Sequence, residues 1–168
     1  GFSRAQYPGI KDESFDVLPM IQQVLDIKQQ QADKEFKIIA SAWTAPPWMK
    51  DINTWYIPGT PENDYQGTGG SLKPQYESTY ADYIVNYLDH YQQAGVELWG
   101  LTPVNEPHGN SGQWESMHFS PESQRDFIKE FLGPKLQASK HDDIKLLIFD
   151  QNRDGLEHWT DVILGDEE

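Results

Sequence analysis

The sequence predicts an α/β fold built on a parallel sheet, and three observations support this prediction. Short apolar runs at 36–43, 98–101 and 144–149 have the length and content of buried strands. Segments with helical periodicity separate these runs, and such alternation implies parallel strands joined by crossovers. Polar or reactive side chains follow each run, as they do at the carboxyl edge of barrels in which strands and helices alternate.

The first two helices are expected from the spacing of their apolar side chains. Leu18, Ile21 and Leu25 recur at helical intervals over about 15–28. A second helix is expected over 80–91, followed by Gly95 as a stop signal. Its apolar residues fall at intervals of three and four and form one continuous stripe: Tyr80, Tyr83, Ile84, Tyr87, Leu88 and Tyr91.

Two further helices are expected in the second half of the chain. Ser120 is a suitable N-cap and Pro121 suits the first helical position, so a third helix should begin there and run to about 132. Gly133-Pro134 should bend or end this helix. Apolar residues at 156, 159 and 163 indicate a fourth helix.

The remaining segments are expected to be irregular. Residues 1–16 contain a Pro-Gly turn signal, and residues 51–75 form a long connection rich in Gly, Pro and Asn. A loop of this length in a compact unit is usually functional or mobile. Three strands cannot close a barrel and the sequence does not begin with Met, so we expect a fragment of a longer protein.

Composition excludes several classes of function. The net charge of −14 disfavours binding to nucleic acid, whose phosphates would be repelled. No apolar run approaches the roughly 20 residues that span a bilayer. The chain has no cysteine, so it offers neither disulfides nor thiolate chemistry.

The most informative site candidate follows the apolar run at 98–101. Asn105 and Glu106 stand there directly before Pro107, which prevents the strand from continuing. A carboxyl group at this edge can give a proton to a glycosidic oxygen while the neighbouring amide binds a sugar hydroxyl. The alternative is structural, with Glu106 capping a helix and Asn105 forming a turn.

The other two strand exits carry residues that suit a carbohydrate. Trp43 follows the first run, and Asp150 and Arg153 follow the third. Because parallel strands end at one edge, these side chains should lie on the same rim, where an aromatic face can stack on a pyranose ring. Trp43 could instead be a core residue, and Asp150 could form a structural ion pair with Arg153 rather than touch a substrate.

No metal or nucleotide cofactor is expected. The histidines show no His-x-x-x-His spacing; His90 and His141 should be solvated, whereas His108 and His118 should lie near the cleft. No strand is followed by a dinucleotide-binding or Walker glycine motif. Ser-His-Asp catalysis lacks a nucleophile elbow.

Three segments, in this order, resemble glucosylceramidases, the acid β-glucosidases of glycoside hydrolase family 30. They are Ala-Ser-Ala-Trp-Thr-Ala-Pro-Pro-Trp-Met-Lys at 40–50, Trp-Gly-Leu-Thr-Pro-Val-Asn-Glu-Pro at 99–107 and Phe-Ser-Pro-Glu-Ser-Gln-Arg-Asp-Phe-Ile at 119–128. The resemblance covers nearly the whole chain. It implies a partial (β/α)8 TIM barrel, from roughly the exit of strand 2 to helix 5, in which residues 1–168 are an incomplete catalytic domain. The closing strands and any second β domain would lie outside.

The resemblance also implies roles for single residues. Glu106 would be the general acid/base, and Asn105 would hold the sugar hydroxyl next to the anomeric carbon. Trp43 would pack against the glucose ring, and Phe119 would lie near the aglycone side of the cleft. The family's nucleophile is a glutamate after the seventh strand, so it is expected outside this chain. The family usually has an acidic residue that holds glucose hydroxyls directly before Phe-Ser, where this sequence has Gly1. Either this contact is lost, or the terminal residue reflects how the fragment was made.

The implied reaction is hydrolysis of the β-glucosyl bond of glucosylceramide, with retention, to glucose and ceramide. It needs no cofactor, and its expected partners are the glycolipid and a lipid-presenting activator protein, in a lysosomal or secreted setting. The fragment alone is expected to be inactive. Two alternatives stay open: an endo-glucanase acting on β-1,6-glucan, and a carbohydrate-binding barrel without catalysis.

Overall fold

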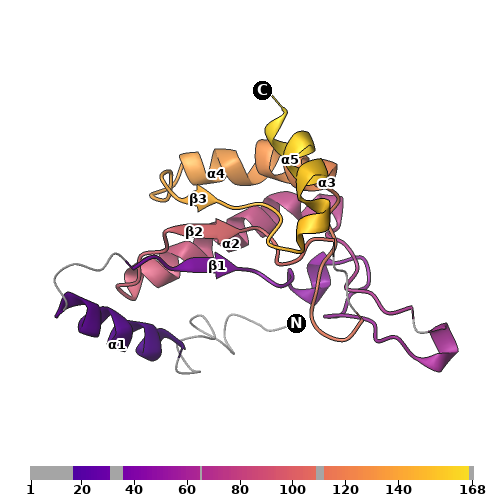
Figure 1. The fold of residues 1–168 in the computed structure, drawn as a ribbon, viewed down its shortest axis with the longest axis horizontal. Helices are drawn as coiled ribbons and strands as arrows, with labels where there is room; N and C mark the ends of the chain where they lie inside the picture. Colours follow the sequence, from indigo (N-terminus) through magenta and orange to yellow (C-terminus); the bar gives the residue numbers. More distant parts are fainter. Residues whose placement is uncertain (1–16, 31–35, 65, 109–111, 167–168) are drawn as a thin grey trace.

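The computed structural model describes residues 17–30, 36–64, 66–108 and 112–166. Within them one parallel sheet has the order β1 (Ile39–Ser41), β2 (Gly100–Thr102) and β3 (Lys145–Leu146) (Figure 1). This confirms the predicted parallel α/β arrangement, although the paired strands are shorter than the apolar runs. β2 stops at Thr102 because the next residue, Pro103, has no N–H for the ladder. The segment predicted to be irregular at 1–16, with Gly1, lies outside the described residues.

Helices alternate with the strands as predicted. The chain runs through α1 (Val17–Gln29), β1, α2 (Glu77–Gln93), β2, α3 (Pro121–Phe127), β3 and α5 (Leu156–Leu164). Short 3-10 turns lie in the connections, namely η2 (Pro47–Met49), η3 (Pro61–Asn63), η4 (Pro74–Tyr76) and η6 (Arg153–Gly155). None of the helices in the described part of the chain is long and apolar enough to cross a membrane.

The buried face of α2 differs in one respect from the predicted stripe. Tyr80, Ile84, Leu88 and Tyr91 are buried as expected. Tyr83 is half exposed and stacks on Tyr80, with their ring centroids 6.3 Å apart. The buried face of α2 is therefore narrower than the spacing predicted. A tyrosine at the edge of this face can cover a buried ring with one side of its own ring and expose the other side to solvent.

The third helix was expected to bend or end at Gly133-Pro134, and it does not end there. α3 continues through the π-helical segment η5 (Ile128–Leu132) into α4 (Gly133–Gln137). The Gly133 N–H donates to the Ile128 carbonyl, five residues earlier, and this wider turn lets the helical path pass the proline that follows. The N-terminus agrees with the prediction, since the Ser120 hydroxyl accepts from the Ser123 N–H at 3.1 Å.

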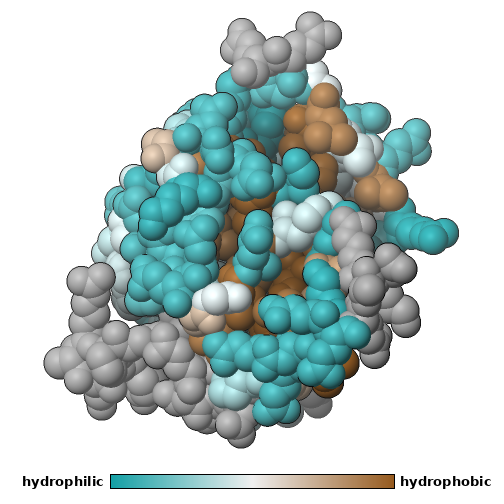
Figure 2. Space-filling view, turned by 90° about the vertical axis from the view of Figure 1, so that its left-hand side faces the viewer, coloured by the Kyte–Doolittle hydropathy of each residue, from teal (hydrophilic) through white to brown (hydrophobic). Residues whose placement is uncertain are grey.

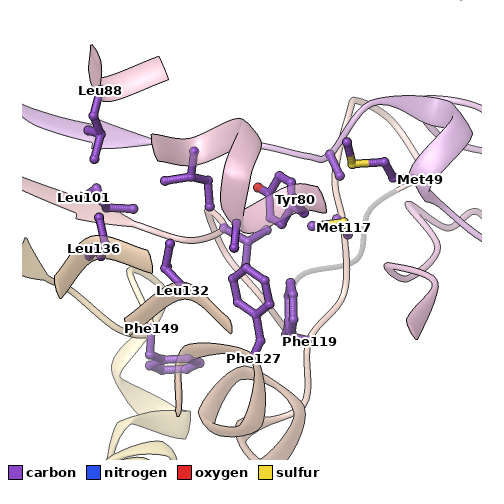
Figure 3. Packing of buried hydrophobic residues seen from close by; sticks show 14 of the residues in the cluster. Met49, Tyr80, Leu88, Leu101, Met117, Phe119, Phe127, Leu132, Leu136 and Phe149 are labelled. Atoms are coloured by element: carbon purple, nitrogen blue, oxygen red, sulfur yellow. The ribbon is translucent and has the colours of Figure 1, made fainter. Parts of the chain in front are cut away.

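The main core lies between the sheet and the helices α2, α3 and α5 (Figure 3). Phe127 has no exposed surface and packs between Tyr80 and Phe119, at centroid distances of 5.6 and 5.7 Å. Phe149 stacks on Trp159 of α5 at 4.9 Å, which joins the third strand exit to this core. These aromatic contacts fix the helices against one face of the sheet.

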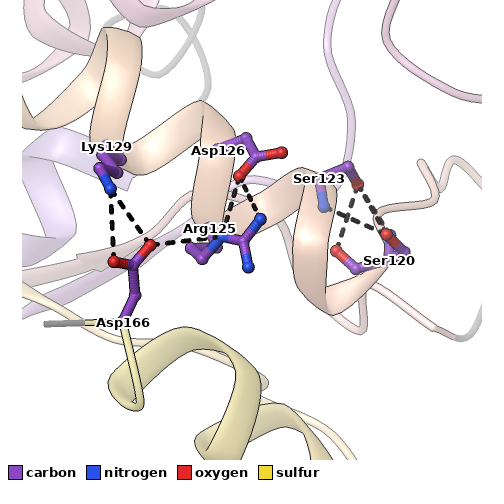
Figure 4. A network of polar contacts seen from close by, with 6 residues as sticks. All are labelled: Ser120, Ser123, Arg125, Asp126, Lys129 and Asp166. Carbon is purple, nitrogen blue, oxygen red and sulfur yellow. Dashed lines mark hydrogen bonds and ion pairs between the residues drawn. The ribbon is translucent and has the colours of Figure 1, made fainter. Parts of the chain in front are cut away.

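Two further contacts hold the outer helices. Leu18 of α1 packs with Tyr91 and Val96 in a smaller cluster at the end of α2. At the other side of the molecule, Asp166 lies 3.5 Å from Arg125 and 3.3 Å from Lys129, and so ties the end of α5 to α3 and η5 (Figure 4). Both ion pairs are partly exposed, so we expect a contribution below about 1 kcal/mol from each.

The amino-terminal ends of the strands form the face that Figure 2 presents, on which apolar residues lie exposed between polar ones. A hollow on this face is lined by residues that precede the strands, among them Ile38, Leu98 and Ile144. The Lys37 ammonium lies 4.7 Å from the centre of the Trp99 ring here. The candidate catalytic residues follow the strands and therefore belong to the opposite edge.

Candidate active site

The segment 103–107 places two polar side chains on an otherwise buried loop at the carboxyl end of β2. Val104 and Pro107 are fully buried, whereas Asn105 and Glu106 are partly exposed. The parallel register of β1, β2 and β3 confirms that all three strand exits meet at this edge. The amide and the carboxylate thus face outward from a packed base.

Three other parts of the chain hold the backbone of this loop. The Asn105 N–H donates to the Ala42 carbonyl after β1 at 2.6 Å. The Tyr80 hydroxyl of α2 donates to the Pro103 carbonyl at 2.8 Å. The Phe119 N–H donates to the Pro107 carbonyl at 3.0 Å. The helix-cap interpretation of Glu106 is wrong, because no helix begins within 103–108 and the next helix in the described part of the chain, α3, is capped by Ser120.

Glu106 has an unusual backbone conformation. Its φ angle is +44°, in the left-handed region that residues with a side chain seldom adopt. Such a conformation costs on the order of 1 kcal/mol and persists only where the surroundings enforce it; it is frequent at active sites. The hydrogen bonds around the loop supply this enforcement.

Asp150 brings the third strand exit into the site. Its Oδ1 lies 3.3 Å from the Glu106 nitrogen and 3.2 Å from Thr102 Oγ1, and its Oδ2 accepts from Ser41 Oγ at 2.9 Å. Ser41 and Thr102 are register partners on β1 and β2, so their side chains leave the same face of the sheet. Sequence reasoning missed both; the available signal was a hydroxyl residue near the end of each of the first two apolar runs.

The predicted ion pair between Asp150 and Arg153 is not formed. Arg153 is exposed in η6, and neither residue takes part in an ion pair within the described part of the chain. Asp150 turns inward instead because hydroxyl and amide donors at the sheet edge satisfy its carboxylate. It therefore lies partly buried at the edge of the sheet, next to the backbone of Glu106.

The two aromatic candidates lie in different surroundings. Trp43 is 50% exposed after β1, which favours a surface role over the core alternative. Phe119 is 3% exposed and packs on Phe127, so in this chain its ring belongs to the core beneath the 103–107 loop. A contact between Phe119 and a substrate stays a prediction.

The histidines divide into two groups. His108 and His118 lie beside the site, with ring centres 6.3 Å apart; burial, and then the proximity of His108, lower the pKa of His118. His141 was expected to be solvated but is buried, 3.0 Å from Asp89 of α2, because the end of α4 turns it back onto that helix. Among the described residues, no group of three or more His, Asp or Glu could hold a metal ion.

Lys50 joins the start of the long loop to the segment around Ser116 and has an altered pKa. Its side chain is fully buried, and its ammonium donates to the Trp55 carbonyl at 2.6 Å and to the Ser116 carbonyl at 2.8 Å. Burial lowers the pKa of Lys50 to about 8, against the opposing effect of Asp51 and Glu115. The 51–75 segment is further pinned by a bridge between Lys50 and Leu72.

This lowered pKa predicts a pH dependence of stability. Between pH about 8 and 10.5 the unfolded state holds a proton on Lys50 that the folded state has released, so the free energy of unfolding should rise with pH. We compare the whole protein with its Lys50→Met variant, which lacks this titrating group. The unfolding free energy of the wild type minus that of the variant should rise by up to about 3 kcal/mol across this window. Denaturant titrations at several pH values measure it, and a flat or falling difference contradicts the assignment.

The comparisons with known proteins agree on one family. The profile described as the glycosyl hydrolase family 30 TIM-barrel domain matches residues 8–168. The chain is 35% identical over 158 residues to lysosomal acid glucosylceramidase of Mus musculus, covering 90% of this chain and 28% of that protein. It spans about a quarter of the length of the curated relatives it matches.

Solved structures give the same result. SrfJ from Salmonella typhimurium superposes with a TM-score of 0.79 at 28% identity, over 99% of this chain and 32% of that one. The endo-beta1,6-glucanase BT3312 superposes with a TM-score of 0.76 at 29% identity, over 94% of this chain and 34% of that one.

Proposed function

The chain belongs to glycoside hydrolase family 30, and we propose that it forms part of a retaining β-glucosidase in which Glu106 is the general acid/base. The observation that carries the proposal is the position of Asn105 and Glu106: they are the partly exposed residues of a buried, hydrogen-bonded loop at the carboxyl edge of a parallel sheet. In TIM barrels this edge carries the catalytic residues.

The proposed reaction has two steps. Protonated Glu106 gives its proton to the departing glycosidic oxygen while a carboxylate from the rest of the barrel attacks the anomeric carbon. Glu106 then takes a proton from water, which hydrolyses the glycosyl-enzyme with overall retention. This mechanism needs the two carboxyl groups about 5–5.5 Å apart. The nucleophile belongs to the part of the barrel beyond this chain, so the isolated chain is expected to be inactive.

Asn105 and Trp43 are proposed to bind the sugar. Both belong to the rim that Glu106 occupies, and the side-chain oxygen of Asn105 lies 3.4 Å from Ser41 Oγ. The half-exposed Trp43 offers an aromatic face for the glucose ring. Phe119 is proposed to shape the aglycone side indirectly, through its packing beneath the site.

We propose glucosylceramide as the substrate of the whole protein, in a lysosomal setting. The name of the mouse relative, together with 35% identity over most of the chain, supports this choice. A lipid substrate also gives a reason to expect an activator protein that presents it. The likeness to a β-1,6-glucanase structure supports the alternative polysaccharide substrate.

Hydrolysis of both candidate substrates by the whole protein separates these possibilities. We expect release of glucose from glucosylceramide in detergent micelles, loss of this activity in the Glu106→Gln variant, and at least about tenfold lower kcat/KM on β-1,6-glucan. Activity confined to the glucan would identify β-1,6-glucan as the substrate and leave the acid/base role of Glu106 unchanged. Binding of sugar without hydrolysis of either compound would favour a non-catalytic barrel.

A further inference from the structure

The Asp150 carboxylate is the point at which the three strand exits are joined. It contacts the Ser41 hydroxyl on β1, the Thr102 hydroxyl on β2 and the backbone nitrogen of Glu106. Within the described residues no lysine or arginine pairs with it. Neutral donors therefore hold this carboxylate, and one of them is the backbone of the proposed acid/base.

We propose that Asp150 is a positioning residue for catalysis: its Oδ1 holds the Glu106 backbone in the left-handed conformation and thereby sets the direction of the Glu106 side chain. This inference rests on the proposed function, because Glu106 is the acid/base that Asp150 positions.

The physical basis is the strain at Glu106. With φ at +44°, residue 106 lies in a conformation that a glutamate leaves unless a partner retains its N–H. Removing the Asp150 carboxylate leaves that N–H without its acceptor and allows φ to relax. The direction of the Cα–Cβ bond changes with φ, so the carboxyl group moves relative to the glycosidic oxygen.

Ser41 and Thr102 complete the arrangement by orienting Asp150. The Ser41 hydroxyl has one hydrogen, which goes to Asp150 Oδ2 at 2.9 Å. Thr102 Oγ1 lies 3.0 Å from the Val104 carbonyl and 3.2 Å from Asp150 Oδ1, so its hydrogen is shared between these acceptors. Both hydroxyls come from strand residues, which gives the carboxylate a rigid support.

The test uses the whole protein and two substrates that differ in their need for an acid. The alcohol of an alkyl β-glucoside is a poor leaving group and needs a proton from an acid. The dinitrophenolate of dinitrophenyl β-glucoside departs without protonation. We expect Asp150→Ala to lower kcat/KM on the alkyl glucoside by about 10²-fold, the cost of a small misplacement of a catalytic group. The value on the dinitrophenyl glucoside should stay within about tenfold of wild type, because its departure needs no general acid.

Two matched controls separate positioning from a general structural role. Asp150→Asn keeps an oxygen for the Glu106 N–H and should restore most of the activity on the alkyl glucoside. In a Glu106→Gln background, Asp150→Ala should cause no further loss, because the residue through which it acts is already disabled. If Asp150→Ala fails to fold, Ser41→Ala should give a weaker loss with the same dependence on the leaving group.

Equal losses on both substrates, as expected for a direct sugar contact or for general damage, would overturn the inference. Additive losses in the Glu106→Gln background would overturn it as well. If Glu106→Gln shows the dependence on the leaving group and Asp150→Ala does not, the positioning role alone fails. If Glu106→Gln itself lacks this dependence, the acid/base assignment fails, and the positioning role fails with it.

Discussion

Replacing Glu106 by Gln in the whole protein is expected to abolish most activity on substrates with poor leaving groups. General acid assistance contributes about 10²–10⁴-fold, so kcat/KM on glucosylceramide or an alkyl β-glucoside should fall by about this factor. Glutamine is nearly isosteric with glutamate, and the hydrogen bond to Asp150 uses the backbone N–H, so the variant should keep it. The loss should therefore come from the missing proton and not from a moved loop.

The control is an activated aryl glucoside measured on the same preparations. Its kcat/KM reports bond cleavage without acid assistance and should stay within about tenfold of wild type, whereas kcat should fall because the second step still needs a base. Equal losses of kcat/KM on both substrates would show that Glu106 does not act as the acid.

The largest expected effect on stability comes from Phe127→Ala. Phe127 is fully buried between Tyr80 and Phe119, and the segments that carry these two residues also hold the 103–107 loop, at Pro103 and Pro107. Truncation of such a side chain costs about 3–5 kcal/mol through lost burial and the cavity left behind. We expect the midpoint of denaturant unfolding of the whole protein to fall accordingly.

Phe127→Leu is the matched variant, since it keeps most of the volume and should cost markedly less than the alanine variant. Because the core supports the 103–107 loop, the alanine variant should also lose activity on both classes of glucoside alike. Nearly equal and small losses of stability in the two variants would contradict the central place of Phe127 in the core.

Periodicity predicted the elements of the fold because apolar side chains at helical or strand spacing decide which face is buried. It located α2 and the Ser120 cap, since the relevant interactions lie within a few residues along the chain. At Gly133-Pro134 it predicted a bend or an end, and it did not predict the π-helical segment through which the third helix continues. That outcome depends on the π-type bond from Gly133 to Ile128, which residue preferences do not reveal.

The apolar runs also predicted part of the candidate site. Asn105 and Glu106 were found because they follow an apolar run, and the parallel sheet explains why other strand exits join them. The contacts of Asp150 were not predictable, because they involve hydroxyl groups 48 and 109 residues away in the sequence. His141 was misjudged because its partner, Asp89, lies on another helix.

Azide rescue of a Glu106→Gly variant of the whole protein tests the central claim most directly. With dinitrophenyl β-glucoside the glycosyl-enzyme still forms, and a small anion can enter the space left by the missing carboxyl group and attack without a general base. Two inversions at the anomeric carbon retain its configuration, so the account predicts faster turnover and β-glucosyl azide as the product. α-Glucosyl azide would identify Glu106 as the nucleophile, and the absence of any acceleration would contradict its role as the acid/base.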